Sequence, residues 1–483
     1  AALLEALGAF AARPPHAARS ARILEDLWQR LANSGVLSAA PRSLGGGGAS
    51  GSVVWELEHV EAAHFRYPGS TAFVRFLQQV LPASTAGTRA EALLTGVQHA
   101  APGGVLGVPG IPAAMGAAAA AAGAPPTAPY VAFVVDRVFL PASRRVYADP
   151  EERWRVSATC LAFLDHCLAS LDMRALFADD STPDAPVLEQ LARHPGFEVL
   201  KRLLAGTPVL RELLAFLHPD PGAAGFEAVN AQGARPTPFT EAVRSALRIV
   251  LRVLQLQDTF LAVLLPALSE AGGALRAAAG SRAAYMPLDM HLLHAHGVVV
   301  QVALFVNCVQ DDIALLALRT LALLAQSRTF RATDRFGGTL HRQSMNRLVG
   351  VLVMTDEAER VKAGVLGWLE ALRGMSGDVE ALAAAAATLG EPEADEEGAA
   401  AATAPGDATA AIARALLDLL LENTQRTSEA PNIAHLLLGF DLRAARDEDQ
   451  LVDADARGRP ASVLGALVAL LRPPSGGAAA TAD

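Results

Sequence analysis

The chain has 483 residues, of which 52% are hydrophobic and only 5% aromatic, so it can bury a large core built mainly from alanine and leucine. Short β-branched clusters and abundant helix formers argue against sandwiches and barrels, and the composition predicts an all-α protein. A formal net charge of −10, with arginines scattered singly, lacks the basic surface that nucleic-acid binding requires.

Three further global features limit the interpretation. The most apolar stretch, residues 298–309, is shorter than the ~20 residues of a membrane span and reads as a buried core helix. The chain begins at Ala1 without an initiator methionine, so we expect a piece of a longer protein. Three cysteines in apolar surroundings are too few for a disulfide framework and suit a reducing compartment: Cys160, Cys167 and Cys308.

Residues 1–82 are expected to hold the N-terminal helices. The first helix carries apolar residues at the spacing of one face: Ile23, Leu24, Leu27, Trp28 and Leu31. A glycine-rich linker at 41–52 separates it from helices at 53–65 and 70–81. Residues 83–129 are rich in Ala, Gly and Pro with few charges, which predicts a long disordered insertion.

A central α-solenoid is predicted over residues 130–389. A helix from Tyr130 stops near Pro141, and a longer helix over 150–171 forms an antiparallel pair with it. Thr207 precedes Pro208 and is expected to cap a helix that ends near Leu217.

The next segments continue this alternation. Residues 219–238 read as a loop, and the apolar stretch 240–268 is expected to form two helices broken around Asp258. Residues 288–326 predict one apolar helix through Val309, a polar turn and a second helix, which together have the size of a helical repeat.

Further helices are expected at 345–354 and 357–372, followed by an Ala-rich helix. An acidic flexible linker is predicted at 390–408, C-terminal helix pairs at 409–472 and a disordered tail at 473–483. The C-terminal helices lie at 410–422, 431–440 and 461–471.

About 15 to 18 helices, mostly in neighbouring pairs, are typical of a HEAT/ARM-like α-solenoid, a superhelical stack of antiparallel helix pairs. Each pair leaves an apolar face that only the next pair can cover. Such stacks present long surfaces to partner proteins, whereas catalysis needs converging polar groups.

The sequence gives little support for a metal site or for a reactive thiol. His291 and His294 share a helical face, but His296 points away from both, so zinc binding is disfavoured relative to surface histidines. Cys160 and Cys167 are seven residues apart and have no metal or redox spacing, which favours buried apolar thiols.

Other candidates also have simpler structural interpretations. The four glycines of one low-complexity stretch follow no predicted strand, which disfavours a nucleotide site: Gly103, Gly104, Gly107 and Gly110. Two aspartate pairs are interpreted as helix caps: Asp179 with Asp180, and Asp311 with Asp312. The preferred interpretation of the acidic run is a solvated linker, and the alternative is a docking tail for a basic partner: Glu391, Glu393, Asp395, Glu396 and Glu397.

One apolar stripe near the C-terminus is interpreted as part of the core, with a partner-binding groove as the alternative: Ile433, Leu436, Leu437 and Phe440. We predict no catalytic, cofactor-binding or metal-binding residue and no enzymatic activity, and we name no partner-binding residue.

Several helices, read in order, resemble the large inner-ring scaffold of the nuclear pore, the nucleoporin 205 family, called nucleoporin 192 in fungi. The resemblance is to its middle region. The segments that carry it are YPGSTAFVRFLQQVL (67–81), YVAFVVDRVFL (130–140), EERWRVSATCLAFLDHCL (151–168), PGFEVLKRLLAGTPVLRELLAFL (195–217) and PNIAHLLLGFDL (431–442).

The resemblance implies a superhelical scaffold of the pore's inner ring, at the nuclear envelope, that binds linker nucleoporins of the nucleoporin 93, nucleoporin 35 and nucleoporin 98 types and supports nucleocytoplasmic transport. It implies neither catalysis nor a cofactor. Two alternatives remain open: the related nucleoporin 188 scaffold, and a soluble HEAT-repeat transport receptor or adaptor.

Overall fold

The computed structural model describes eight stretches of the chain. They are residues 53–80, 128–177, 184–218, 225–336, 343–375, 405–425, 430–440 and 462–471. The predicted helix around Trp28, the glycine-rich linker, most of the Ala/Gly/Pro-rich insertion, the Ala-rich helix, most of the acidic linker and the tail lie outside these residues. The predicted domain boundaries therefore stay predictions.

The chain divides into two compact units. Unit 1 comprises Ala1–Phe216 and Pro236–Leu288, and unit 2 comprises Leu217–Arg235 and Asp289–Asp483. Nearly all described residues are helical, which confirms the predicted all-α class and is consistent with a helical solenoid.

The elements of unit 1 in chain order are α3 (Val53–Trp55), η1 (Glu56–Glu61), α4 (Ala62–His64), α5 (Pro68–Val80), α8 (Ala128–Ala132), η2 (Phe133–Phe139), α9 (Leu140–Ala142), α10 (Pro150–Ala169), η3 (Arg174–Phe177), α11 (Ala185–Arg193), α12 (Pro195–Leu204), α13 (Pro208–Ala215), α15 (Pro238–Thr259), η4 (Phe260–Leu264), α16 (Leu265–Ala271), α17 (Gly273–Ala279) and η5 (Arg282–Ala284).

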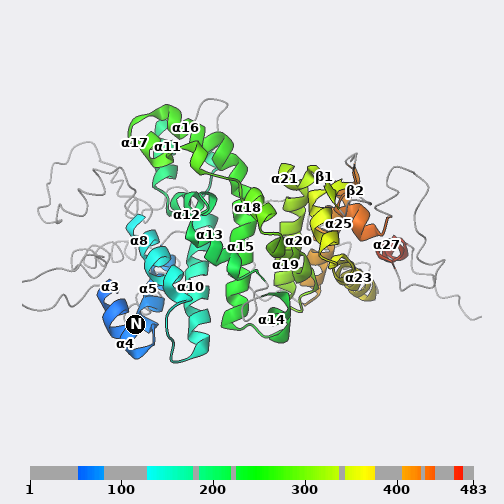
Figure 1. Cartoon of the computed structure of the whole chain (residues 1–483), viewed down its shortest axis with the longest axis horizontal. Helices are drawn as coiled ribbons and strands as arrows, with labels where there is room; N and C mark the ends of the chain where they lie inside the picture. The colour runs from blue at the N-terminus through cyan, green and yellow to red at the C-terminus, as the bar shows by residue number, and fades with distance from the viewer. Residues whose placement is uncertain are drawn as a thin grey trace, which may run out of the picture. The chain divides into compact units, whose positions relative to one another are not determined.

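The core of unit 1 lies between α10 and α15, and α10 also packs against α5 and α12 (Figure 1). Trp154 of α10 meets the rings of Phe216 and Phe239 edge-on, with centroids 6.0 and 4.9 Å away. Edge-to-face aromatic pairs of this kind add to the apolar area that the helices bury. Three aromatic side chains thus pack together beside these two helices.

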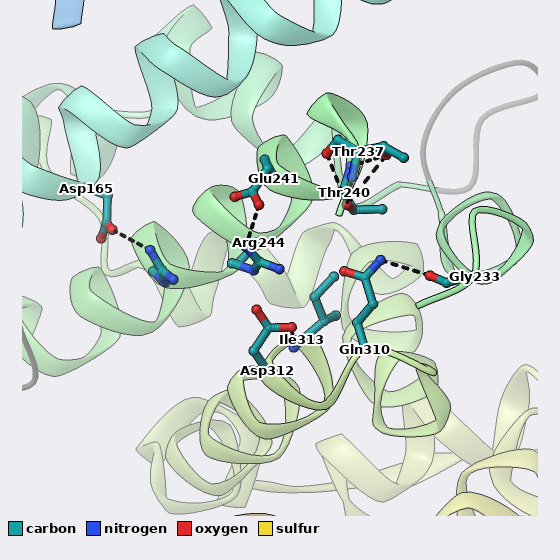
Figure 2. A network of polar contacts seen from close by, with 10 residues as sticks. Asp165, Gly233, Thr237, Thr240, Glu241, Arg244, Gln310, Asp312 and Ile313 are labelled. Carbon is teal, nitrogen blue, oxygen red and sulfur yellow. Dashed lines mark hydrogen bonds and ion pairs between the residues drawn. The ribbon is translucent and has the colours of Figure 1, made fainter. Parts of the chain in front are cut away.

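A partly buried ion pair also joins α10 to α15. The Asp165 carboxylate, labelled in Figure 2, accepts a hydrogen bond from Arg252 Nε at 2.8 Å. Arg248 lies 3.8 Å from its other oxygen. Burial raises the pKa of Asp165, and the two arginines oppose that rise. The pair satisfies a carboxylate that would otherwise be costly inside the helix stack.

The predicted break at Asp258 is wrong, because α15, the π-helical turn η4 and α16 form one continuous helix. Asp258 is exposed, so its carboxylate is solvated without any interruption of the helix. The N-terminus of α15 carries a capping box between Thr237 and Thr240, visible in Figure 2.

Within the described residues, the helix Pro238–Ala271 is the one that is long and apolar enough to cross a membrane. Half of its most apolar stretch is buried inside the protein. Because this helix packs against α10, the core of unit 1 accounts for its composition.

Two π-helical turns each precede a leucine–proline step. The amides of Leu140 and Leu265 donate five residues back, to Val135 O and Phe260 O, and Pro141 and Pro266 follow. Proline lacks the amide proton and crowds the carbonyl four residues earlier, so a local departure from α geometry accommodates it. The wider turns let both helices run past their prolines.

Thr207 does not cap α13 as predicted, although the helix begins at Pro208 as expected. The Thr207 hydroxyl instead donates to the carbonyl of Arg202 at 2.7 Å, at the end of α12. This hydroxyl therefore satisfies a helix C-terminus rather than a helix N-terminus.

The elements of unit 2 are α14 (Phe226–Ala231), α18 (Leu288–His294, of which Leu288 is assigned to unit 1), α19 (His296–Leu304), η6 (Phe305–Asn307), α20 (Asp311–Gln326), α21 (Arg328–Arg331), β1 (Thr333–Phe336), β2 (Gln343–Asn346), α22 (Arg347–Met354), α23 (Ala358–Met375), α25 (Pro405–Gln425), α26 (Ile433–Leu438) and α27 (Val463–Leu471).

In unit 2, α25 packs against α20 and α23, and α27 packs against α23 (Figure 1). Two side chains tie η6 to α23: Trp368 Nε1 donates to Val306 O at 2.7 Å, and Asn307 Nδ2 donates to Arg360 O at 2.8 Å. A Cβ at Gly364 would lie 1.3 Å from Asn307 Oδ1, so any larger residue at this position would displace the Asn307 amide group. The contact between η6 and α23 therefore depends on these two hydrogen bonds as well as on the burial of apolar side chains.

Two further sequence predictions in unit 2 are wrong, and one short element was not predicted. The loop expected at 219–238 contains α14, which forms because Phe226 is buried and its amide donates to Gln301 Oε1 at 2.8 Å. The helix expected through Val309 is broken at Ala295, two residues before Gly297, whose low helix propensity weakens the first turn of α19. Residues 333–336 and 343–346 pair as an antiparallel hairpin that the all-α prediction did not include.

Candidate interaction surface

Two loops meet at one end of unit 1. The loop between α4 and α5 contains Phe65, and the loop between α9 and α10 contains Val146. The amide of Ala148 donates to Phe65 O at 2.9 Å, and the hydroxyl of Tyr67 donates to Val146 O at 3.3 Å. Because these bonds use backbone carbonyls, they fix the path of both loops.

Tyr67 anchors this junction. Its side chain is 2% exposed, and its ring meets that of Tyr147 edge-on with centroids 5.1 Å apart. The Arg145 guanidinium lies 5.1 Å from the centroid of Tyr67, and the amide of Tyr67 donates to Glu152 Oε1 at 2.6 Å. Burial raises the pKa of Tyr67, against the opposing effect of Arg145. The tyrosine in the segment YPGS is therefore a structural anchor.

Arg145 has a second role in the same junction. Pro141 cannot donate to the carbonyl of Arg137, four residues earlier, and that carbonyl accepts a hydrogen bond from Arg145 Nη2 instead. One arginine thus stabilises the proline-containing helix end and covers the buried Tyr67 ring.

Glu61 fixes the start of α5. Its buried carboxylate accepts hydrogen bonds from the amides of Gly69 and Ser70 and from the Ser70 hydroxyl. Burial raises the pKa of Glu61, although the bonds to Ser70 and Gly69 favour the charged form. A carboxylate at a helix N-terminus satisfies amides that have no partner within the helix. The chain leaving Phe65 is held firmly as a result.

Phe65 occupies an unusual position in this frame. It ends α4 with φ 54° and ψ 30°, in the left-handed region where helices ordinarily place glycine. Its side chain remains 46% exposed, and Val146 on the adjacent loop is 62% exposed. Arg66 and Arg144 flank them and are also exposed. We call these four residues the 65/146 surface: Phe65, Arg66, Arg144 and Val146.

A further close contact lies within the same unit. His194 ends the turn before α12, and its Nδ1 accepts a hydrogen bond from the Gly196 amide at 3.0 Å. A Cβ at Gly196 would lie 2.2 Å from the carbonyl oxygen of Cys167 on α10. Burial, and secondarily His166, lower the pKa of His194 to about 4, so its ring is neutral at pH 7.

The candidate thiols are buried apolar groups. Cys160, Cys167 and Cys308 are buried thiols that form no disulfide, and burial raises the pKa of Cys160 to about 12 and raises that of Cys167 as well. A thiol that remains protonated is a poor nucleophile and a poor metal ligand. The structural interpretation of Cys160 and Cys167 is confirmed.

The predicted histidine cluster spans the break between α18 and α19. His291 and His294 belong to α18, whereas His296 begins α19. Across the described residues, no group of three His, Cys, Asp or Glu side chains is arranged to hold a metal ion. The glycines around Gly104, the pair Asp179 and Asp180, and the acidic run at 391–397 lie outside those residues.

Asp311 and Asp312 lie in the first turn of α20, as predicted, but the residue at the cap position is Gln310. The Asp312 carboxylate accepts from the amide of Ile313 at 2.9 Å (Figure 2). Burial raises the pKa of Asp311, and the neighbouring Asp312 raises it further. These carboxylates interact with the helix N-terminus rather than with an active site.

The apolar stripe of α26 belongs to the core. Ile433, Leu436 and Leu437 are buried, and Phe440 is partly buried. Asn432 Oδ1 accepts from the amides of Ala434 and His435, and Gly439 ends the helix with φ 82°. The segment PNIAHLLLGF is therefore a complete helix with its N-terminal cap and C-terminal glycine.

Comparison with known proteins identifies the family. Residues 1–475 match the Nup192 family model, described as the nuclear pore complex scaffold, nucleoporins 186/192/205. Nucleoporin NUP192 of Chaetomium thermophilum is 25% identical over 332 residues, a match that covers 66% of this chain and 17% of the fungal protein. The matched region is thus a small part of that relative. The chain belongs to the Nup192 family of nuclear pore complex scaffold nucleoporins, and its location is accordingly the nuclear pore complex.

Proposed function

We propose that this chain is part of a structural, non-catalytic scaffold in the inner ring of the nuclear pore complex, where it holds linker nucleoporins and supports nucleocytoplasmic transport. The observation that carries the proposal is the match of residues 1–475 to a nuclear pore scaffold family. The helix-on-helix packing within each unit suits this role, since stacked helices offer extended surfaces for partner segments.

The proposed partners are linkers of the nucleoporin 93, nucleoporin 35 and nucleoporin 98 types. Linkers of this kind would bind through short segments, because a helical stack offers grooves and loop clusters rather than one deep pocket.

Tagging the full-length protein at its own locus tests the proposal. A punctate nuclear rim is expected, and averaged super-resolution images should place the tag symmetrically about the midplane of the envelope. Affinity capture from nuclei should recover the three linker types. A diffuse cytosolic signal, or cargo binding that depends on a small GTPase, would contradict the scaffold role and favour a transport receptor.

A further inference from the structure

We propose that the 65/146 surface is a docking site for a short acidic segment that carries a large apolar side chain, supplied by a partner protein. This inference deepens the proposed scaffold role and rests on it. It assigns partner binding to four side chains on two loops of unit 1: Phe65, Arg66, Arg144 and Val146.

The first argument is the conformation of Phe65. A left-handed backbone costs a bulky residue free energy, and the packing of a side chain that is 46% exposed recovers little of it. Glycine or asparagine would end α4 at lower cost. The aromatic ring is therefore poorly explained by the needs of the helix end, and strain combined with exposure is typical of residues that bind ligands.

The second argument is rigidity. Both loops are held by the hydrogen bonds to Phe65 O and Val146 O, and Tyr67 is packed between Tyr147 and Arg145 beneath them. A surface on a fixed frame loses little conformational entropy when a partner binds. Phe65 and Val146 are thus held on two joined loops before any partner arrives.

The third argument is charge. Arg66 and Arg144 are exposed and form no salt bridge within 4 Å of any described residue, although Arg66 lies close enough to Asp149 to help lower the pKa of that carboxyl. Two nearby acids are already engaged: Glu58 pairs with Arg137 at 3.0 Å, and Asp149 pairs with Arg155 at 2.6 Å. The two loops therefore carry two exposed arginines without a salt-bridge partner and two exposed apolar side chains, within a chain whose net charge is −10. An occupant with carboxylates around an apolar anchor matches both features.

Fluorescence polarisation with the purified chain tests the proposal. The probes are short fluorescein-labelled peptides, each with one Phe, Leu or Trp among Asp and Glu residues. Saturable binding is expected, and Phe65→Asn should weaken it about tenfold or more. Peptides with Asn and Gln in place of the acids should bind more weakly, since the two arginines then lose their partners.

Two matched controls separate docking from general surface effects. Phe177 is an aromatic residue of the same unit with 62% exposure, and Phe177→Asn should leave peptide binding unchanged. The double variant Arg66→Glu/Arg144→Glu should abolish binding. Charge reversal at two other exposed arginines, in the double variant Arg75→Glu/Arg211→Glu, should leave most of the peptide binding intact.

Thermal unfolding distinguishes a docking role from a structural one. Phe65→Asn should keep the melting temperature within about 3 °C of the unmodified chain, because asparagine tolerates the left-handed position. A large fall in melting temperature would mean that Phe65 supports the fold, and this would overturn the proposal. Equal binding by Phe65→Asn and Phe177→Asn, equal binding of acidic and neutral peptides, or no saturable binding would also overturn it.

The two proposals can fail separately. A chain that reaches the nuclear rim but binds none of the peptides contradicts the docking site alone. A chain that binds the peptides through Phe65 but stays diffuse in the cytosol contradicts the pore role and leaves the docking chemistry in place.

Discussion

Asp165 and Arg252 connect the two central helices of unit 1 through a hydrogen bond of 2.8 Å between a carboxylate oxygen and Nε. The Asp165 side chain is 10% exposed and that of Arg252 is 25% exposed, so water screens the pair only in part. The apolar packing of α10 against α15 and this ion pair therefore stabilise the same contact.

Arg252→Gln should destabilise the contact between α10 and α15 by about 2 kcal/mol, because the buried Asp165 carboxylate then loses its charged hydrogen-bond donor. A chain of this size and division is not expected to unfold in one step, so hydrogen exchange of the α10 and α15 amides is the appropriate measurement. Asp418→Asn is the control, since Asp418 is exposed and 3.8 Å from Arg414. It should cost less than about 0.5 kcal/mol. Equal effects of both variants would contradict this account.

Gly196→Ala should destabilise unit 1 by about 2 to 3 kcal/mol, since the new methyl group would lie 2.2 Å from the Cys167 carbonyl. Gly367→Ala in α23 is the matched control, because nothing lies within 4 Å of its added Cβ. That variant should gain up to about 1 kcal/mol from helix propensity. Hydrogen exchange of the α12 amides for the first variant and of the α23 amides for the second measures the two effects. A neutral Gly196→Ala would show that α10 and α12 can separate freely.

Helix positions were largely predictable because apolar periodicity is a local property of the sequence. The expected helices at 53–65, 150–171, 357–372 and 461–471 correspond to described helices within a few residues. The hairpin was not predictable, since β1 is largely exposed and its partner strand is held by tertiary bonds such as that from the Asn346 amide to Pro431 O. Strand pairing of this kind leaves no periodic signal in four residues.

The 65/146 surface was also invisible to the periodicity of the sequence. A positive φ at Phe65 and the contact between its loop and that of Val146 depend on segments about 80 residues apart. One local signal was available: a phenylalanine directly after a helix, where glycine is usual, and directly before the segment RYPGS. That signal indicates an unusual helix end but does not identify the neighbouring loop.

Unit 1 should lose stability as the pH falls from about 6.5 to about 4. The unfolded chain binds a proton at His194 near its ordinary pKa of 6.5, whereas burial keeps the folded ring neutral down to a pKa of about 4. Protons therefore favour the unfolded state in this window, by up to about 3 kcal/mol at its lower end. Melting temperatures recorded from pH 7 to pH 4 measure the effect.

His194→Asn provides the comparison, because asparagine can accept the Gly196 amide hydrogen bond and does not titrate. This variant should lose the His194 component of the pH dependence while keeping the components of the carboxylates. An unchanged pH profile in His194→Asn would show that protonation of this ring does not oppose folding.

Asn432 should contribute through two separable hydrogen-bonding functions. Its Oδ1 caps α26 by accepting from the Ala434 and His435 amides, and its Nδ2 donates to Asn423 O of α25 at 2.8 Å. Asn432→Ser keeps a cap acceptor but removes the bond to α25, whereas Asn432→Ala removes both. Serine should therefore cost about 1 kcal/mol and alanine about 2 kcal/mol, as measured by hydrogen exchange of α26. If the two variants cost the same, the cap adds nothing, and the loss comes from the bond between α25 and α26.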